Sequence, residues 1–218
     1  MIPRFAIAIP SAGQATKLVI LAYIVLVSSA CYLLILRGLE AAPPLAFGGV
    51  RTLLGGISLL VVARVFGQPL VPAKTLWKWI PWVALTATTL TFGSMFLSPR
   101  FAGAGLASIL GNAQPLFIAL IAFMFLNERL SRPQLTALGC GLVGIMIIIL
   151  PSVSGQDNLL LTGTVLALTT SLAAAIGTIF VRHLNLTGSL LAFSAWQLII
   201  GGTALLLLSG GISEPNIQ

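Results

Sequence analysis

The stretch LAFGGVRTLLGGISLL (residues 45–60) recurs as LAFSAWQLIIGGTALL (residues 191–206), and this repetition decides the fold. The two copies share seven identities in sixteen positions at an offset of 146 residues. Some matches are expected by chance in an apolar chain, but LAF and GG at a fixed separation indicate an internal duplication. The first copy also carries a charge, Arg51, inside an otherwise apolar run.

The composition around these copies is that of an integral membrane protein. The chain has 218 residues, of which 58% are hydrophobic and 7% are charged, whereas about a quarter of the residues are charged in soluble domains. The mean hydropathy is +1.09. The net charge is +7, but the basic residues lie between apolar blocks, so they indicate topology in a lipid bilayer and predict no nucleic-acid partner.

Seven apolar blocks follow one another after an N-terminal tail, residues 1–16. Each is long enough, or nearly so, to cross a hydrocarbon core of about 30 Å as a helix. They lack the alternation of barrel strands, so the sequence predicts an all-α, polytopic helix bundle. The blocks are residues 17–36, 44–63, 76–97, 102–125, 134–150, 159–181 and 190–209.

The basic residues predict the orientation of these helices. If the blocks alternate in direction, one side holds eight basic residues and the other holds Arg37 and Arg100. The eight are Arg4, Lys17, Arg64, Lys74, Lys78, Arg129, Arg132 and Arg182. The N-terminus is therefore expected in the cytoplasm. We also expect Trp77, Trp79 and Trp82 to anchor the third helix at this interface.

The repeat has a consequence for the architecture. The first unit, residues 17–151, holds five helices, and an odd number makes the second unit enter the membrane inverted. Inverted repeats are typical of secondary transporters, with the substrate bound near the midplane. Two complete units need about 290 residues. We therefore expect an inverted five-plus-five repeat of which seven helices are present, a second unit (159–218) that is incomplete, and a truncated sequence.

The residues give no support to an enzyme. The sequence contains no HExxH, GxSxG or GxxxxGK[ST] motif, and its histidine, His183, follows Arg182 at a predicted helix end. Cys31 and Cys140 fall inside apolar blocks without metal-ligand spacing. We expect no catalytic residue, no metal site and no cofactor.

Four polar residues are candidates for substrate binding: Arg51, Asn112, Gln114 and Gln197. An arginine at a helix centre costs about 2.5–3.5 kcal/mol on insertion scales. It either faces a protein interior or aqueous cavity, or extends to the outer interface. Gln197 occupies the repeat-related position and is too short to reach the interface, which favours the first alternative. Asn112 and Gln114, next to Pro115, either line a transport path or bridge helices.

The run ASILGNAQPLFIALIAFMFLNERLSRPQLTALGCGLVGIMIIIL (residues 107–150) resembles the EamA-type members of the drug/metabolite transporter superfamily. It has a proline-containing fourth helix, a Glu-Arg-Leu turn and a glycine-rich fifth helix. Ser131 is expected as the N-cap of the latter and Pro133 as a residue of its first turn. The resemblance implies ten helices in two inverted units, and movement of small metabolites, often outward.

Two functions stay open at this point. The first is a secondary transporter of the inner cell membrane that exports small metabolites such as amino acids by alternating access. The second is a truncated, non-transporting membrane protein or assembly partner. A small-molecule substrate is expected for the first, and assembly with further copies of the chain is open for both.

Overall fold

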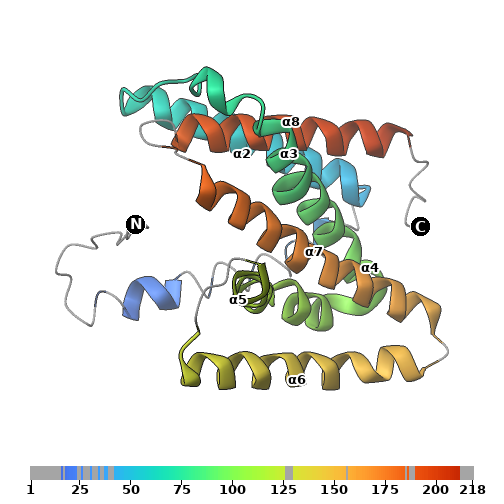
Figure 1. Cartoon of the computed structure of the whole chain (residues 1–218). Coiled ribbons are helices and arrows are strands. Elements are labelled where there is room, and N and C mark those ends of the chain that lie inside the picture. Colours follow the sequence, from blue (N-terminus) through green and yellow to red (C-terminus); the bar gives the residue numbers. More distant parts are fainter. Residues whose placement is uncertain are drawn as a thin grey trace.

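The computed structural model of the chain describes residues 16, 18–23, 26, 30, 34, 37, 38, 42–125, 130–155, 157–184, 186 and 190–211 (Figure 1). All regular structure among these residues is helical, with seven α-helices. Five helical segments are long and apolar enough to cross a membrane: Pro44–Val65, Ile80–Gly111, Arg132–Val153, Asn158–His183 and Leu190–Gly211. The protein is therefore a multi-pass membrane protein.

The helices follow in the order of the predicted blocks. They are α2 (Pro44–Val65), a 3-10 turn η1 (Lys74–Leu76), α3 (Ile80–Val83), a π-helix η2 (Ala84–Leu90), α4 (Thr91–Gly111), α5 (Gln114–Phe125), α6 (Arg132–Ser154), α7 (Asn158–His183) and α8 (Leu190–Gly211). Blocks 44–63, 134–150, 159–181 and 190–209 are confirmed as α2, α6, α7 and α8. Of the predicted first helix, 17–36, the structure describes residues 18–23, 26, 30 and 34, and all of these are helical.

The third and fourth blocks divide differently from the prediction. Instead of ending near residue 97, the third helix continues without a loop to Gly111 and bends at Gly103 (φ 72°, ψ 160°). Glycine adopts this conformation because it has no Cβ. The fourth block breaks at Asn112 and Ala113 instead of running unbroken to residue 125. Pro115 has no N–H with which to continue the helical hydrogen bonds across this break.

The π-helix η2 interrupts the span Ile80–Gly111 directly after the 4 residues of α3. Its sequence, ALTATTL, is followed directly by Thr91. The Thr91 hydroxyl donates a hydrogen bond of 2.9 Å to the carbonyl of Thr86, five residues earlier. The Thr86 hydroxyl donates to the Trp82 carbonyl at 2.9 Å. Side chains thus bind carbonyl groups around the wider turn, and such π-turns frequently lie at functional sites.

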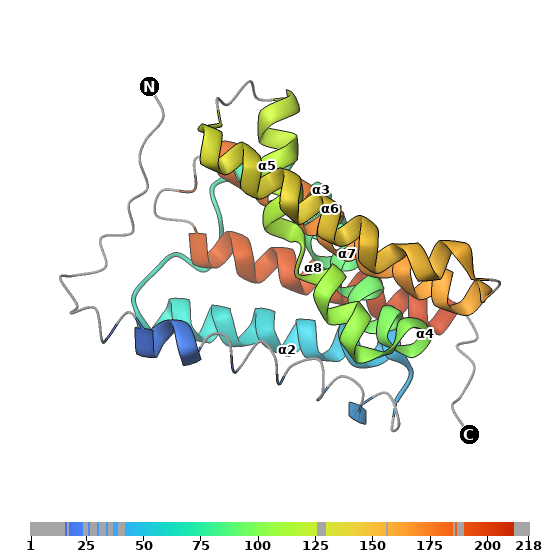
Figure 2. The same cartoon turned by 90° about the horizontal axis from the view of Figure 1, so that it is seen from below.

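The described helices form three layers (Figures 1 and 2). α2 and α8 lie side by side in one layer, α4 and α7 cross in the middle, and α6 lies with α5 on the far side. The middle layer packs closely at two glycines of α7. A Cβ on Gly163 would lie 2.5 Å from the Ala102 nitrogen, and one on Gly177 would collide with Ala87. Small residues here let the backbones approach, as in other membrane helix pairs.

Two helix starts are stabilised by side chains. The Asp157 carboxylate accepts hydrogen bonds from the backbone N–H groups of Leu159 (2.9 Å) and Leu160 (3.2 Å) at the start of α7. At α6, the Ser131 N–H and hydroxyl both donate to the Gln134 side-chain oxygen, at 2.9 and 2.8 Å. The predicted Ser131 cap is confirmed, and the paired caps fix where both helices begin.

Candidate functional site

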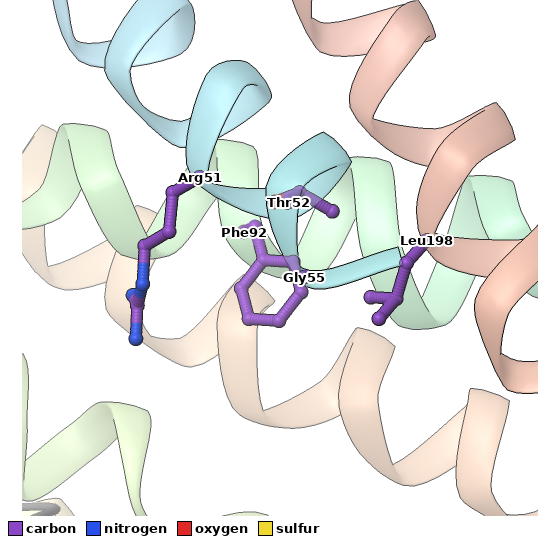
Figure 3. Close-up of a pocket in the computed structure, with 5 residues that line it drawn as sticks. All are labelled: Arg51, Thr52, Gly55, Phe92 and Leu198. Atoms are coloured by element: carbon purple, nitrogen blue, oxygen red, sulfur yellow. The ribbon is translucent and has the colours of Figure 1, made fainter. Parts of the chain in front are cut away.

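The pocket beside Arg51 lies between α2, α4 and α8. It has a volume of about 160 Å³ and is lined by Arg51, Thr52, Gly55, Phe92 and Leu198 (Figure 3). The Arg51 guanidinium carbon lies 5.7 Å from the centre of the Phe96 ring, which is fully buried. Cation–π contacts of this kind hold a guanidinium against protein. Arg51 thus lies on the side of α2 that meets α4.

Gln197, at the repeat-related position of α8, faces a filled site instead. Its side-chain amide donates a hydrogen bond of 3.3 Å to the hydroxyl of Thr88 in η2. Thr88 is fully buried. The neighbouring Thr89 hydroxyl donates to the Gly201 carbonyl at 3.2 Å. The π-helix therefore contacts α8 through the hydroxyl groups of Thr88 and Thr89. The equivalent part of α2 instead lines the pocket.

The glycines of the two copies explain this difference. A Cβ on Gly201 would lie 2.5 Å from Thr88 Cβ, so η2 packs directly against the α8 backbone. A Cβ on Gly55, the equivalent residue of α2, would meet Leu198 Cδ1 at 3.9 Å and no other atom within 4 Å. The open position lines the pocket. The first glycine of the pair thus makes a helix contact on α8 and leaves space on α2.

The two repeat copies also contact one another directly. A Cβ on Gly49 would come within 3.1 Å of the Gly202 oxygen, and one on Gly56 within 2.9 Å of the Ala195 oxygen. With the offset of 146 residues, Gly49 corresponds to Ala195 and Gly56 to Gly202. Replacing each residue by its counterpart in the other copy therefore converts the Gly49–Gly202 contact into the Gly56–Ala195 contact. Because low residue numbers of α2 meet high numbers of α8, the two helices are antiparallel.

Asn112 and Gln114 lie at the break between α4 and α5. The Asn112 amide donates a hydrogen bond of 2.7 Å to the Ser108 carbonyl of its own helix. The Gln114 amide donates to the hydroxyl of Thr178 at 2.9 Å and to the Ala174 carbonyl at 3.4 Å, both on α7. Neither residue lines the Arg51 pocket. The structure thus places Arg51 in a pocket with Leu198 of α8 and Gln114 at a contact with α7, whereas the Asn112 amide binds its own helix.

Four aromatic residues form two ring contacts: Trp77 with Trp196, and Trp79 with Phe180. The rings of Trp77 and Trp196 are 5.3 Å apart, and those of Trp79 and Phe180 are 6.2 Å apart. The Trp196 indole N–H donates a hydrogen bond of 3.0 Å to the Leu70 carbonyl. The predicted anchor tryptophans Trp77 and Trp79 thus connect helices, whereas Trp82 is 63% exposed.

Phe92, Leu198 and the π-helical threonines were not among the residues selected from the sequence. Aromatic and aliphatic residues in an apolar block give no signal that distinguishes a pocket wall from a lipid-facing surface. The run ALTATTL does show three threonines in seven residues, which could have indicated a buried polar contact. Among the described residues, no group of three or more His, Cys, Asp or Glu gathers as a metal site.

Comparison with known proteins relates this chain to transporters. A family model described as the EamA-like transporter family matches residues 16–150. The chain is similar to the uncharacterized transporter YvbV of Bacillus subtilis, with 29% identity over 197 residues. It is also similar to a protein of Salmonella typhimurium named "Probable amino-acid metabolite efflux pump", with 35% identity over 152 residues.

These alignments cover most of the chain but only part of each relative. They include 89% of this chain and 63% of the Bacillus protein, and 68% of this chain and 48% of the Salmonella protein. The chain therefore spans less than two thirds of the length of these relatives. No solved structure matches it significantly.

Proposed function

This chain belongs to the EamA-like transporter family, and from that premise we propose that it acts in a secondary transporter that exports small metabolites such as amino acids. No chemical reaction is part of this function, and the solute moves by alternating access between two inverted units. Residues 17–151 form the first unit and residues 159–218 belong to the second. The membrane is the inner cell membrane, with the N-terminus in the cytoplasm.

The main support for this proposal is that the contacts between α2 and α8 are equivalent when the two copies are exchanged. Gly49 meets Gly202 and Gly56 meets Ala195, and a second pair follows the same rule. A Cβ on Gly56 would lie 3.1 Å from the Ile199 nitrogen, and one on Gly202 would lie 3.0 Å from the Leu53 nitrogen. Self-complementary contacts of this kind are characteristic of a two-fold axis. An axis that relates antiparallel repeat copies in a membrane supports inverted units.

The four polar residues have separate roles in the proposed path. Arg51 contacts the solute in the pocket between the two units, and Gln197 holds the π-helix that closes the matching position on α8. Asn112 and Gln114 lie at the α4–α5 break, where the helix can change direction during the transport cycle. The names of relatives such as the Salmonella protein support amino-acid metabolites as the solutes.

The experiment is metabolite profiling of the medium around cells that overproduce the chain. We expect at least one amino-acid metabolite to accumulate outside several-fold above cells with the empty vector. Gly56→Leu should abolish this, since its Cβ position lies 2.9 Å from the Ala195 oxygen. Gly144→Leu is the control, because a Cβ there meets no atom within 4 Å. An unchanged profile, with the protein present in the membrane, would support the non-transporting alternative.

A further inference from the structure

The α3–η2 segment covers α8 at positions where the equivalent part of α2 is exposed. Trp196 and Ile200 of α8 are partly buried against an apolar cluster that includes Ile80 of α3. At the offset of 146 residues, their counterparts on α2 are Val50 and Leu54. These two side chains are 49% and 59% exposed. Both copies thus carry apolar residues at these positions, and on α8 another helix packs against them.

The glycine and polar positions differ in the same way. On α8, the buried Gly201 packs directly against Thr88 of η2, and the Gln197 amide donates to the Thr88 hydroxyl. Their counterparts on α2 are the half-buried Gly55 and Arg51. A guanidinium has five N–H donors, so Arg51 can bind an acceptor on a neighbouring helix in addition to its other contacts. The α2 helix therefore offers a glycine and a hydrogen-bond donor where α8 uses both to hold a helix.

Four of these residues form one face of α2, because residues four apart on a helix are neighbours. We call this set the α2 face: Val50, Arg51, Leu54 and Gly55. The axis that exchanges the antiparallel helices α2 and α8 is perpendicular to the plane of the two helices. It therefore takes η2 from its position on α8 to an equivalent position on the α2 face. This position lies on the same side of the α2–α8 layer as α4, next to the pocket that Arg51 and Gly55 line.

The contacts on α8 define the kind of helix that fits. Ile80 and Val83 belong to the cluster against which Ile200 packs, and Thr88 occupies the space at Gly201. A hydroxyl side chain is small enough to lie against a glycine and accepts a hydrogen bond from the donor beside it. The acyl chain of a lipid offers no such acceptor. The α2 face thus fits a protein helix that carries branched aliphatic residues followed by a threonine or serine.

We propose that the α2 face binds a further membrane helix of this chemistry. The aliphatic residues of that helix cover Val50 and Leu54, and its hydroxyl residue contacts Gly55 and accepts a hydrogen bond from Arg51. The bound helix lies beside α4 and closes the Arg51 pocket, so the solute site is complete only when the helix is present. This inference rests on the inverted units of the proposed function and names the partner of its site.

A peptide of residues 80–111 tests this proposal, because it has the required residues and is long and apolar enough to cross a membrane. The purified full chain with Cys31→Ser carries a fluorescent donor at Cys140, which is exposed, and the peptide carries the acceptor. Energy transfer is measured in detergent micelles, in which the peptide can take either direction. We expect saturation at one peptide per chain. A peptide of residues 132–153, from the more apolar α6, should bind at least about tenfold more weakly.

Variants assign the binding to the α2 face. Gly55→Leu in the chain should weaken peptide binding at least about tenfold, because the new side chain occupies the space of the bound helix. Gly105→Leu is the matched control, since a Cβ there meets no atom within 4 Å, and it should leave binding unchanged. In the peptide, Thr88→Leu should weaken binding as much as Gly55→Leu does. Leu85→Ala should not, because Leu85 is 53% exposed in the chain.

Three results would overturn the inference: no saturable energy transfer, equal binding of the α6 peptide, or full binding by the Gly55→Leu chain. A dimer that forms without peptide and dissociates in Gly55→Leu would also overturn it, and would assign the α2 face to a second copy of the chain. Metabolite export without peptide binding would refute the inference alone. Peptide binding that depends on Gly55, without any metabolite export, would refute the proposed function alone.

Discussion

The wall of α2 around Arg51 and the wall of α8 around Gln197 have similar sequences, but their surroundings differ. On α8, the π-helix packs against Gly201 and its Thr88 accepts a hydrogen bond from Gln197 at 3.3 Å. On α2, the equivalent Gly55 is open and lines a pocket with Arg51. The Gln197 amide thus contacts the π-helix that fills the space beside α8, whereas the Arg51 guanidinium lies beside the open pocket on α2. A GG pair therefore permits another element to pack closely against the helix, and the neighbouring residues determine which element does so.

The largest difference is expected from adding a side chain at the two equivalent glycines. Gly201→Leu forces a side chain into Thr88, whose Cβ lies 2.5 Å from the Cβ position. We expect the free energy of unfolding to fall by about 3 kcal/mol, at the upper end for overpacking. Gly55→Leu should change it by less than about 0.5 kcal/mol, as at an open position. Unfolding in mixed micelles with increasing SDS, followed by circular dichroism, measures both; equal losses would refute the comparison.

Arg51→Leu should have an effect of intermediate size and opposite sign. A cation in a membrane helix costs about 2.5–3.5 kcal/mol on insertion scales, whereas the contact with Phe96 contributes about 0.5–2 kcal/mol. The free energy of unfolding should therefore rise by about 1 kcal/mol. The same SDS titration measures it. A fall of similar size would show that Arg51 mainly stabilises the fold.

Gln197→Leu should destabilise the protein slightly. The variant removes the hydrogen bond to Thr88 but keeps the volume of the side chain, and side-chain hydrogen bonds between membrane helices average about 0.6 kcal/mol. We expect a loss of this order in the SDS titration. Combining it with Thr88→Val tests the pairing, because the double variant should lose no more than the larger single loss. Additive losses would show that Gln197 and Thr88 do not interact.

The predicted orientation of the helices across the membrane can be tested by cysteine labelling, independently of the stability measurements. In a background with Cys31 and Cys140 replaced, Lys74→Cys should react with a membrane-impermeant maleimide only after the cells are opened. Asp157→Cys should react in intact cells. This pattern follows from a cytoplasmic N-terminus. The reverse pattern would invert the topology of both units.

Much of the fold could be predicted because it depends on local composition. Four of the apolar blocks are confirmed as α2, α6, α7 and α8. The bend at Gly103 and the π-helix could not be predicted, since both depend on packing. Gly103 lies in a run of small residues that is compatible with a straight helix. The turn at ALTATTL is stabilised by Thr91 and by contacts with α8.

The candidate site was predictable for one kind of residue. Arg51 was identified because a charge in an apolar block requires an explanation, and it lines the pocket. Gln114 was identified by the same reasoning, but its amide contacts Thr178 of α7. Polarity in a membrane helix indicates an interaction without indicating its partner. Phe92 and Leu198 were missed because apolar residues give no such signal.

We propose that solute passes through the Arg51 pocket between the two repeat copies. Metabolite profiling of cells that produce Arg51→Gln or Arg100→Gln at equal membrane abundance tests this passage most directly. Each variant removes one arginine that lies over an aromatic ring, at 5.7 Å for Arg51 and 6.0 Å for Arg100. We predict that Arg51→Gln abolishes metabolite export and Arg100→Gln preserves it. Undiminished export by Arg51→Gln would contradict the claim.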